Sequence, residues 1–141
     1  MQNIVEAKVF KVLAALSMTG VNAWLGGWDI ALKLLVFFMV ADYVTGLLVG
    51  IRKKALNSEV MFWGGIRKGA IFIVIAISVM LDEIVGNQSP VFRTLAVYYY
   101  VSREGISVTE NLGLIGVPLP PFITNVLAQL NENNGMKVEQ T

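Results

Sequence analysis

Residues 30–51 read IALKLLVFFMVADYVTGLLVGI and are the longest nearly uncharged segment of the chain. The segment carries only two charged side chains, Lys33 and Asp42. An α-helix of this length extends about 33 Å, which is enough to cross a hydrocarbon core of about 30 Å. Lys33 lies near one end and can reach the headgroups, whereas Asp42 lies past the middle. The segment therefore predicts a membrane-spanning helix with one acidic side chain inside it.

The composition of the whole chain agrees with a membrane protein. Of 141 residues, 55% are hydrophobic and 15% are charged, against about 25% charged in typical soluble domains. The mean hydropathy is +0.65, and the net charge of +1 gives no global field for nucleic acid. The sequence contains no Cys and no His, which excludes disulfides, thiol catalysis, Cys or His zinc sites and His-based triads. We expect no enzyme activity, no cofactor and no metal.

Four further segments have helical patterns, at residues 4–25, 69–85, 92–112 and 122–130. The first is amphipathic and either lies in the membrane interface or crosses the membrane. A cleaved secretory signal is a weaker interpretation, because Glu6 lies in the region that should be positively charged in a signal peptide. Residues 60–66 are expected to form a separate interfacial segment. The predicted fold is an all-α integral membrane protein with three to four membrane-associated helices, oligomeric, with one membrane domain at 1–130 and a polar, disordered tail at 131–141.

A cluster of cations lies between the two clearest spans and sets the orientation. By the positive-inside rule this connection faces the cytoplasm. Both termini are then cytoplasmic if the first and fourth helices also cross, whereas the C-terminus stays outside if the fourth helix lies at the outer surface. The cations serve as topology signals and can contact anionic lipid headgroups. They are Arg52, Lys53, Lys54, Arg67 and Lys68.

Helix packing is suggested within residues 30–51 by a G-x-x-x-G pattern. Asp42, Gly46 and Gly50 lie one turn apart on one face, and Thr45 is adjacent. Small residues let two membrane helices approach closely, so this face predicts self-association, although glycine is also simply frequent in membrane helices. Asp42 then either fixes the assembly through a partner such as Arg93 or Arg103, or faces water on an ion path.

A polar stripe runs along residues 92–112. Each charge exposed to lipid at mid-membrane costs about 2.5–3.5 kcal/mol, so the helix either crosses with this stripe on water or protein, lies at the surface, or switches between the two. Several such helices together would turn the stripe to an aqueous lumen. The stripe consists of Arg93, Tyr100, Glu104, Ser107 and Asn111, with Arg103 and Glu110 at its edge.

Five short motifs in order carry a family resemblance over about residues 30–130. They are Asp42-Tyr-Val-Thr45-Gly46, then Ser58, then Gly64-Gly65-Ile-Arg-Lys68, then Glu104-Gly-Ile-Ser107-Val-Thr-Glu110-Asn111, and Gly116-Val-Pro118-Leu-Pro120. This order resembles the bacteriophage holin family that also contains clostridial toxin-secretion holins. Arg103 departs from the pattern, in which Asn precedes the Glu.

The resemblance implies a holin: a protein that accumulates in the bacterial cytoplasmic membrane, multi-pass, and assembles into homo-oligomeric lesions at a set time. An endolysin or a toxin crosses as cargo, and an antiholin is an expected regulator. The alternatives are a small transporter or channel, which would give selective flux, and an antiholin-like membrane adaptor, which would not permeabilise the membrane alone. A membrane-embedded enzyme is the weakest alternative, since no base–nucleophile set is readable.

Overall fold

The computed structural model describes residues 1–138, and α-helices joined by short linkers are the regular secondary structure of this part of the chain. The helices run in the order α1 (Gln2–Trp24), α2 (Ile30–Arg52), α3 (Ser58–Val85), α4 (Val91–Leu114) and α5 (Pro121–Val138). The all-α prediction is confirmed. By length and composition, one helix of the described chain, α2, is a candidate membrane span by itself. The predicted number of spans thus does not follow from hydropathy alone.

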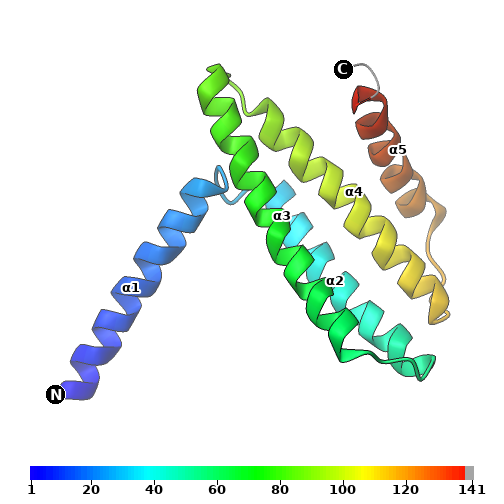
Figure 1. Ribbon diagram of the computed structural model, residues 1–141, viewed down its shortest axis with the longest axis horizontal. Helices are drawn as coiled ribbons and strands as arrows, with labels where there is room; N and C mark the ends of the chain where they lie inside the picture. The colour runs from blue at the N-terminus through cyan, green and yellow to red at the C-terminus, as the bar shows by residue number, and fades with distance from the viewer. Residues whose placement is uncertain (139–141) are drawn as a thin grey trace.

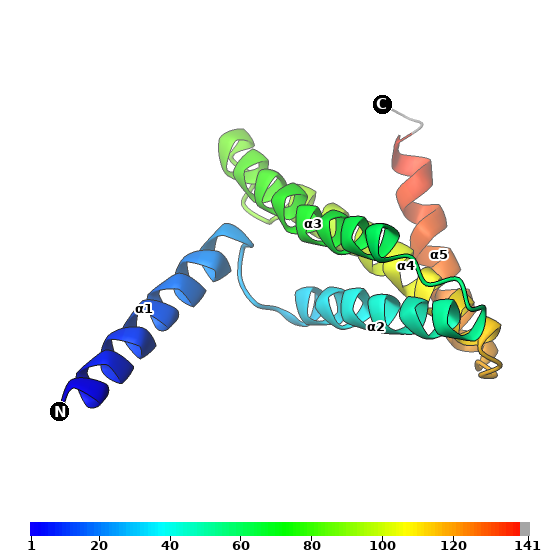
Figure 2. The ribbon, with the colours of Figure 1, turned by 60° about the horizontal axis from the view of Figure 1, so that its bottom comes forward.

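Helix α4 lies at the centre of the arrangement. It packs against α2, α3 and α5, whereas α2 and α3 contact each other little (Figures 1 and 2). The hydrophobic core lies where α2, α3 and α4 meet and consists of Leu25, Leu32, Leu35, Met39, Ile71, Ile75, Val97 and Val101. Helix α4, the most polar of these three helices, is therefore the one that packs against the largest number of other helices.

Helix α1 projects away from the other helices (Figures 1 and 2). None of its residues is buried, and apolar side chains are exposed around it, including Phe10 at 72% and Leu16 at 64%. The sequence predicted an amphipathic helix here, but neither face of α1 is covered by the rest of the chain. It is joined to α2 by the linker 25–29, whose glycines Gly26 and Gly27 have φ of +73° and +101°.

The distribution of polarity is the reverse of that in a soluble bundle. Large apolar side chains cover the outside of α2 and α3, among them Phe37, Val40 and Ile73. Charged side chains such as Asp82, Arg93 and Glu104 are buried inside. Apolar surface of this extent marks a contact with lipid or protein, and polar groups turned inward are typical of membrane helices.

Helix α3 is longer than the sequence indicated. Residues 60–66 are continuous with it, so the prediction that they form a segment separate from a helix starting at 69 is wrong. Asn57 begins the helix, because its Oδ1 accepts from the N–H of Glu59 at 2.9 Å and of Val60 at 3.3 Å. Gly64 and Gly65 cost about 1 kcal/mol each relative to alanine, which does not break a capped helix. The consequence is that Arg67 and Lys68 are helical residues and not loop residues.

Helix α5 is also longer than predicted. Its backbone is helical from Pro121 to Val138, so the prediction of a disordered tail from residue 131 is wrong as far as 138. The remaining predicted tail residues, 139–141, lie outside the described residues. A hydrophobic face with a buried Leu127 packs on α4, which supplies the tertiary contact that a polar helix of this length needs.

At Gly105, helix α4 lies close to a side chain of α5. A Cβ there would lie 2.7 Å from Leu127 Cδ2 and 3.0 Å from Phe38 Cε2. We expect Gly105→Ala to lower the free energy of unfolding by about 1–2 kcal/mol through overpacking, and to raise hydrogen exchange in α5. The matched control is Gly113→Ala, because a Cβ at Gly113 meets nothing within 4 Å. Identical behaviour of the two variants would contradict the packing argument.

Candidate functional site

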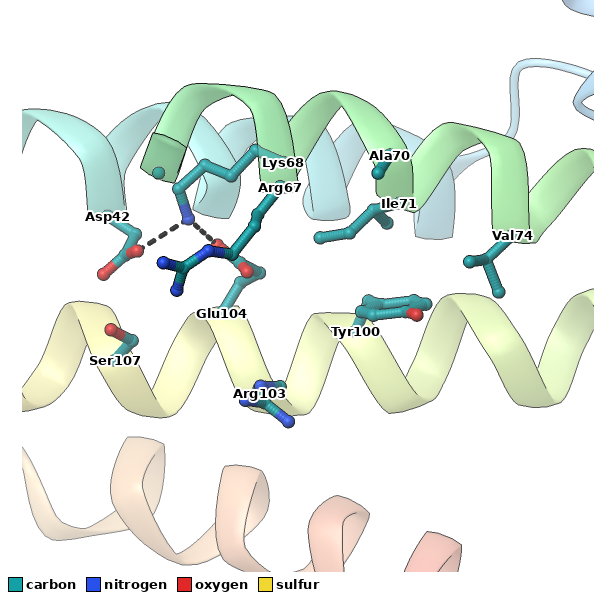
Figure 3. A pocket seen from close by; sticks show the side chains of 11 residues that line it. Asp42, Arg67, Lys68, Ala70, Ile71, Val74, Tyr100, Arg103, Glu104 and Ser107 are labelled. Carbon is teal, nitrogen blue, oxygen red and sulfur yellow. Dashed lines mark hydrogen bonds and ion pairs between the residues drawn. The ribbon is translucent and has the colours of Figure 1, made fainter. Parts of the chain in front are cut away.

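Side chains from three helices form a polar layer inside the bundle. We use this name for Asp42 and Thr45 of α2, Lys68 of α3, and Glu104 and Asn111 of α4. Figure 3 shows Lys68 reaching from α3 towards Asp42 and Glu104. The three charged residues lie near the middle of their helices. A membrane-spanning arrangement of these helices therefore places charge inside the bilayer.

Lys68 bridges two carboxylates. Its Nζ donates to Asp42 Oδ2 at 2.6 Å and also to Glu104 Oε2. Only 17% of the Lys68 side chain and 10% of the Glu104 side chain are exposed. Opposite charges in contact offset part of the cost of removing each ion from water. Lys68 therefore connects α2 and α4, which both depend on it for charge compensation.

Asn111 completes the layer on the side of α2. Its Nδ2 donates to Asp42 Oδ1 at 2.9 Å and to Thr45 Oγ1 at 3.1 Å. Thr45 in turn donates to the carbonyl of Ala41 at 2.7 Å. Both oxygens of the Asp42 carboxylate are thus hydrogen-bonded, one to an amide and one to an ammonium. A partly buried acid needs such partners.

A crevice opens beside the polar layer, between α3 and α4 (Figure 3). Its volume is about 460 Å³. Arg67 and Arg103 both line it, and among the side chains that the structure describes neither has a carboxylate within ion-pairing distance. Arg103 donates instead to the hydroxyl of Tyr99 at 3.2 Å. The remaining lining residues are Asp42, Gly64, Lys68, Ala70, Ile71, Val74, Tyr100, Glu104 and Ser107.

A second polar cluster lies at the other end of the bundle, around Arg93. The Arg93 side chain is 4% exposed, and its guanidinium donates to the carbonyls of Leu25 at 2.6 Å and Gly27 at 2.8 Å. It also pairs with Asp29 Oδ2 at 2.7 Å. A Cβ on Gly26 would lie 2.7 Å from Arg93 Cδ. Arg93 therefore clamps the linker that connects α1 to α2.

Asp82 of α3 caps the start of α4. Pro90 stands at the N-cap position and offers no side-chain acceptor. Asp82 accepts instead from the backbone N–H of Phe92 and of Arg93, each at 2.9 Å, and from Asn87 Nδ2 at 2.7 Å. Donors of the first helical turn need such partners.

The ion pair at Asp29 predicts a pH dependence. The hydrogen bond from Arg93 holds the pKa of the Asp29 carboxyl below its ordinary value. A carboxyl with a depressed pKa stabilises the folded state above its unfolded pKa, and this contribution is lost as the pH falls through the folded value. We expect the thermal stability of the purified protein to fall below about pH 4. Asp29→Asn should be less stable at pH 7 and should lose less stability on acidification; an unchanged acid profile would contradict the assignment.

The structure divides the predicted hydrophilic face of α4. Arg93 and Glu104 are buried, Tyr100, Ser107 and Asn111 are partly buried, and Arg103 and Glu110 are exposed. The face therefore points largely into the chain's own bundle. It brings Glu104 and Asn111 to Asp42, whereas Arg93 lies in the separate cluster near Asp29.

The other predicted residues are also placed. Asp42 is partnered by Lys68 and not by Arg93 or Arg103, because Lys68 is a helical residue of α3 that faces α2. At Gly46 the nearest side chain is Asn111, and at Gly50 it is Leu56, both of the same chain. Arg52 donates to the carbonyl of Leu114 at 3.2 Å, at the end of α4, while Lys53 and Lys54 are exposed.

Three contacts were not predicted from the sequence, those of Lys68, Asp29 and Asp82. Lys68 was grouped with neighbouring cations, since nothing in the sequence tells a paired lysine from a topology signal. The position of Asp29 just before an apolar helix was a readable N-cap signal, and its Oδ1 does accept from the N–H of Leu32 at 2.9 Å. The cap from Asp82 crosses a turn and leaves no local pattern.

Comparison with known proteins identifies the class. The model of the bacteriophage holin family matches residues 19–132, which include the whole of the polar layer and the linker clamp. The chain belongs to the bacteriophage holin family, and the resemblance seen in its motifs is confirmed. Membership places it at the cytoplasmic membrane and points to a non-enzymatic role.

Individual relatives cover most of the chain. An uncharacterized protein of Clostridium perfringens is 41% identical over 79% of this chain and 83% of its own length. An uncharacterized 14.9 kDa protein of Clostridium perfringens is 38% identical over 93% of this chain and 98% of its own. A protein of Bacillus phage phi105 described as a probable holin is 32% identical over 84% of this chain and 87% of its own. No solved structure matches the chain.

Proposed function

We propose that this protein is a holin that assembles into homo-oligomeric lesions in the bacterial cytoplasmic membrane. The lesions let an endolysin, or a toxin, cross to the cell wall, and timed lysis follows. The observation that carries the proposal is the polar layer: three packed helices with apolar outer faces hold Asp42, Lys68 and Glu104 between them. The wall of an aqueous lesion needs a hydrophilic face, and these helices would provide one if they turned the three charged side chains towards water.

The proposed topology has α2, α3 and α4 crossing the membrane, with the connection between α2 and α3 in the cytoplasm. Exposed Trp28 and Trp63 mark the two interfaces, where tryptophan is enriched. At 1.5 Å per residue, Trp28 lies about 20 Å from the level of Asp42, and Trp63 about 8 Å from Lys68 on the other side. The two distances together match a hydrocarbon core of about 30 Å.

Two arrangements of the same helices account for a harmless and a permeable state. In the closed arrangement, α4 buries its polar face against α2 and α3 through Lys68. In the proposed open arrangement, α4 separates from α3, and the face with Glu104 and Ser107 turns to an aqueous lumen shared by several copies. The ion pairs at Lys68 oppose this opening, so the balance between the two states depends on the polar layer.

Inducible expression in bacteria tests the function. We expect a delayed and abrupt loss of viability, with release of folded cytosolic marker proteins of increasing size. Slow leakage of small solutes with full retention of proteins would indicate a transporter or channel. Viable cells without leakage would indicate an adaptor that acts through another membrane protein. Either of these results would overturn the holin proposal.

The chain contains no cysteine, which makes single-cysteine labelling direct. Ser107→Cys, in the crevice, should react with a membrane-impermeant thiol reagent after the onset of lysis and little before it. Phe37→Cys, on the exposed apolar face of α2, is the control and should stay unreactive. Equal labelling of position 107 before and after lysis would contradict the opening of α4.

A further inference from the structure

The crevice between α3 and α4 has the chemistry of a lipid site. We propose that it binds the phosphate headgroup of an anionic phospholipid from the cytoplasmic leaflet, with Arg67 and Arg103 as the headgroup contacts. The inference rests on the proposed membrane topology and concerns the regulation of the same bundle. Neither Arg67 nor Arg103 forms an ion pair with a residue of the polar layer.

The side chains that line the crevice carry a net charge of one positive unit, which one further anion would neutralise. Three cationic side chains line it, Arg67, Lys68 and Arg103, against the two carboxylates of Asp42 and Glu104. Lys68 forms ion pairs with both carboxylates. Neither arginine has a carboxylate partner among the described side chains. A phosphodiester carries one negative charge and would bring the site to neutrality. Arginine is also the side chain best suited to phosphate, because its planar fork can donate two hydrogen bonds.

Polarity changes along the crevice in one direction. On α3 the lining runs from Arg67 and Lys68 to Ile71 and Val74. On α4, which runs antiparallel to α3 beside it, the lining runs from Ser107 and Arg103 to Tyr100. The charged end is therefore the same end on both helices, as Figure 3 shows. A phospholipid has this distribution, with a charged head and an apolar chain that continues towards the membrane centre.

The depth of the charged end fits the cytoplasmic headgroups. Phe62 and Trp63 lie little more than one turn before Arg67 on the same helix and are 65% and 51% exposed. Aromatic side chains of this kind mark the headgroup level. Long cationic side chains within about a turn of that level can reach a phosphate there. Basic pockets between helices on the cytoplasmic side are a known form of anionic lipid site.

A lipid in this position would hold α3 and α4 together. Its phosphate would contact one arginine from each helix and neutralise the charge that otherwise repels across the crevice. Since the proposed open state separates these two helices, the bound lipid favours the closed state. The structure thus couples the lipid composition of the inner leaflet to the opening of the bundle.

The test measures the melting temperature of the purified full-length protein in a neutral detergent. Phosphatidylglycerol is expected to raise the melting temperature by several degrees, whereas phosphatidylcholine, sn-glycerol 3-phosphate and inorganic phosphate are expected to leave it unchanged. An equal shift with phosphatidylcholine would show general lipid binding, and an equal shift with the two soluble phosphates would show a phosphate site without a lipid. Either result would overturn the proposal.

Variants locate the effect. Arg67→Gln combined with Arg103→Gln is expected to lower the affinity for phosphatidylglycerol at least tenfold, measured from bound lipid in native mass spectra. Lys8→Gln combined with Lys11→Gln removes the same charge from exposed residues of α1, outside the crevice, and should leave the affinity within twofold. Equal losses in both pairs would indicate a nonspecific surface effect and would contradict the site. Far-UV circular dichroism verifies that each pair folds.

The lipid-binding measurements and the expression assay can fail independently of each other. Lipid selectivity with no protein release would leave the lipid site in place and remove the lesion function. Protein release without lipid selectivity would do the reverse.

Discussion

Lys68→Met is expected to lower the free energy of unfolding by about 3 kcal/mol, because it leaves the buried carboxylate of Glu104 and the partly buried carboxylate of Asp42 without a counter-ion. Asp42 would retain the amide of Asn111 at 2.9 Å, but Glu104 would lose the only side-chain partner recorded for it in the described chain. The measurement is denaturation of the purified protein in detergent, followed by far-UV circular dichroism. In cells the same variant should cause earlier lysis, because the closed arrangement is weakened more than the open one.

The control for this variant is Lys53→Met, which removes one exposed cation from the connection between α2 and α3. We expect it to change stability by less than about 0.5 kcal/mol. A second comparison isolates the unpaired charges: adding Asp42→Asn and Glu104→Gln to Lys68→Met should restore most of the lost stability. A triple variant as unstable as the single one would show that Lys68 acts through packing of its methylene groups and not through charge.

The fold was largely readable from the sequence because apolar segments and helix breakers are local signals. The span at 30–51 needed only length and hydropathy, and α2 runs from Ile30 to Arg52. The boundary of α3 was misread because Trp63 and the glycines before Arg67 look like an interface. A local reading cannot weigh these signals against the cap at Asn57, which is worth about 1 kcal/mol.

The candidate site was only partly readable, since its contacts join residues far apart in the chain. The stripe of α4 was found from periodicity, but periodicity cannot say whether a polar face meets water or another helix. The partner that settles this is Lys68, which is 36 residues from Glu104 in the chain. Its role depends on the packing of α3 against α4, which no spacing in the sequence records.

The two polar clusters have different structural consequences. The polar layer connects α2, α3 and α4 to one another, so it bears on whether α4 can separate from the bundle. The Arg93 cluster connects α4 to the linker 25–29, so it bears on the direction of α1. Because α1 has no extensive contact with the other described helices, the linker is what fixes its direction.

Arg93→Met is therefore expected to release α1 as well as to lower stability by about 2–3 kcal/mol. The substitution leaves the carbonyls of Leu25 and Gly27 without their buried donor, and each such loss costs about 1–3 kcal/mol. Asp29, whose side chain is 48% exposed, can be hydrated again and adds little. The glycines Gly26 and Gly27 then allow the linker to take other conformations.

The orientation of α1 can be measured by spin labels, since the chain offers no native cysteine. Labels at Leu16→Cys on α1 and Ile77→Cys on α3, both exposed, should give one narrow distance distribution in the parent protein and a broad one with Arg93→Met. Arg93→Lys should lie between them, because an ammonium cannot meet all three acceptors in the fork geometry of arginine. Arg103→Met, which removes an exposed arginine from the same helix, should leave the distribution narrow. A narrow distribution in Arg93→Met would mean that contacts other than this clamp orient α1.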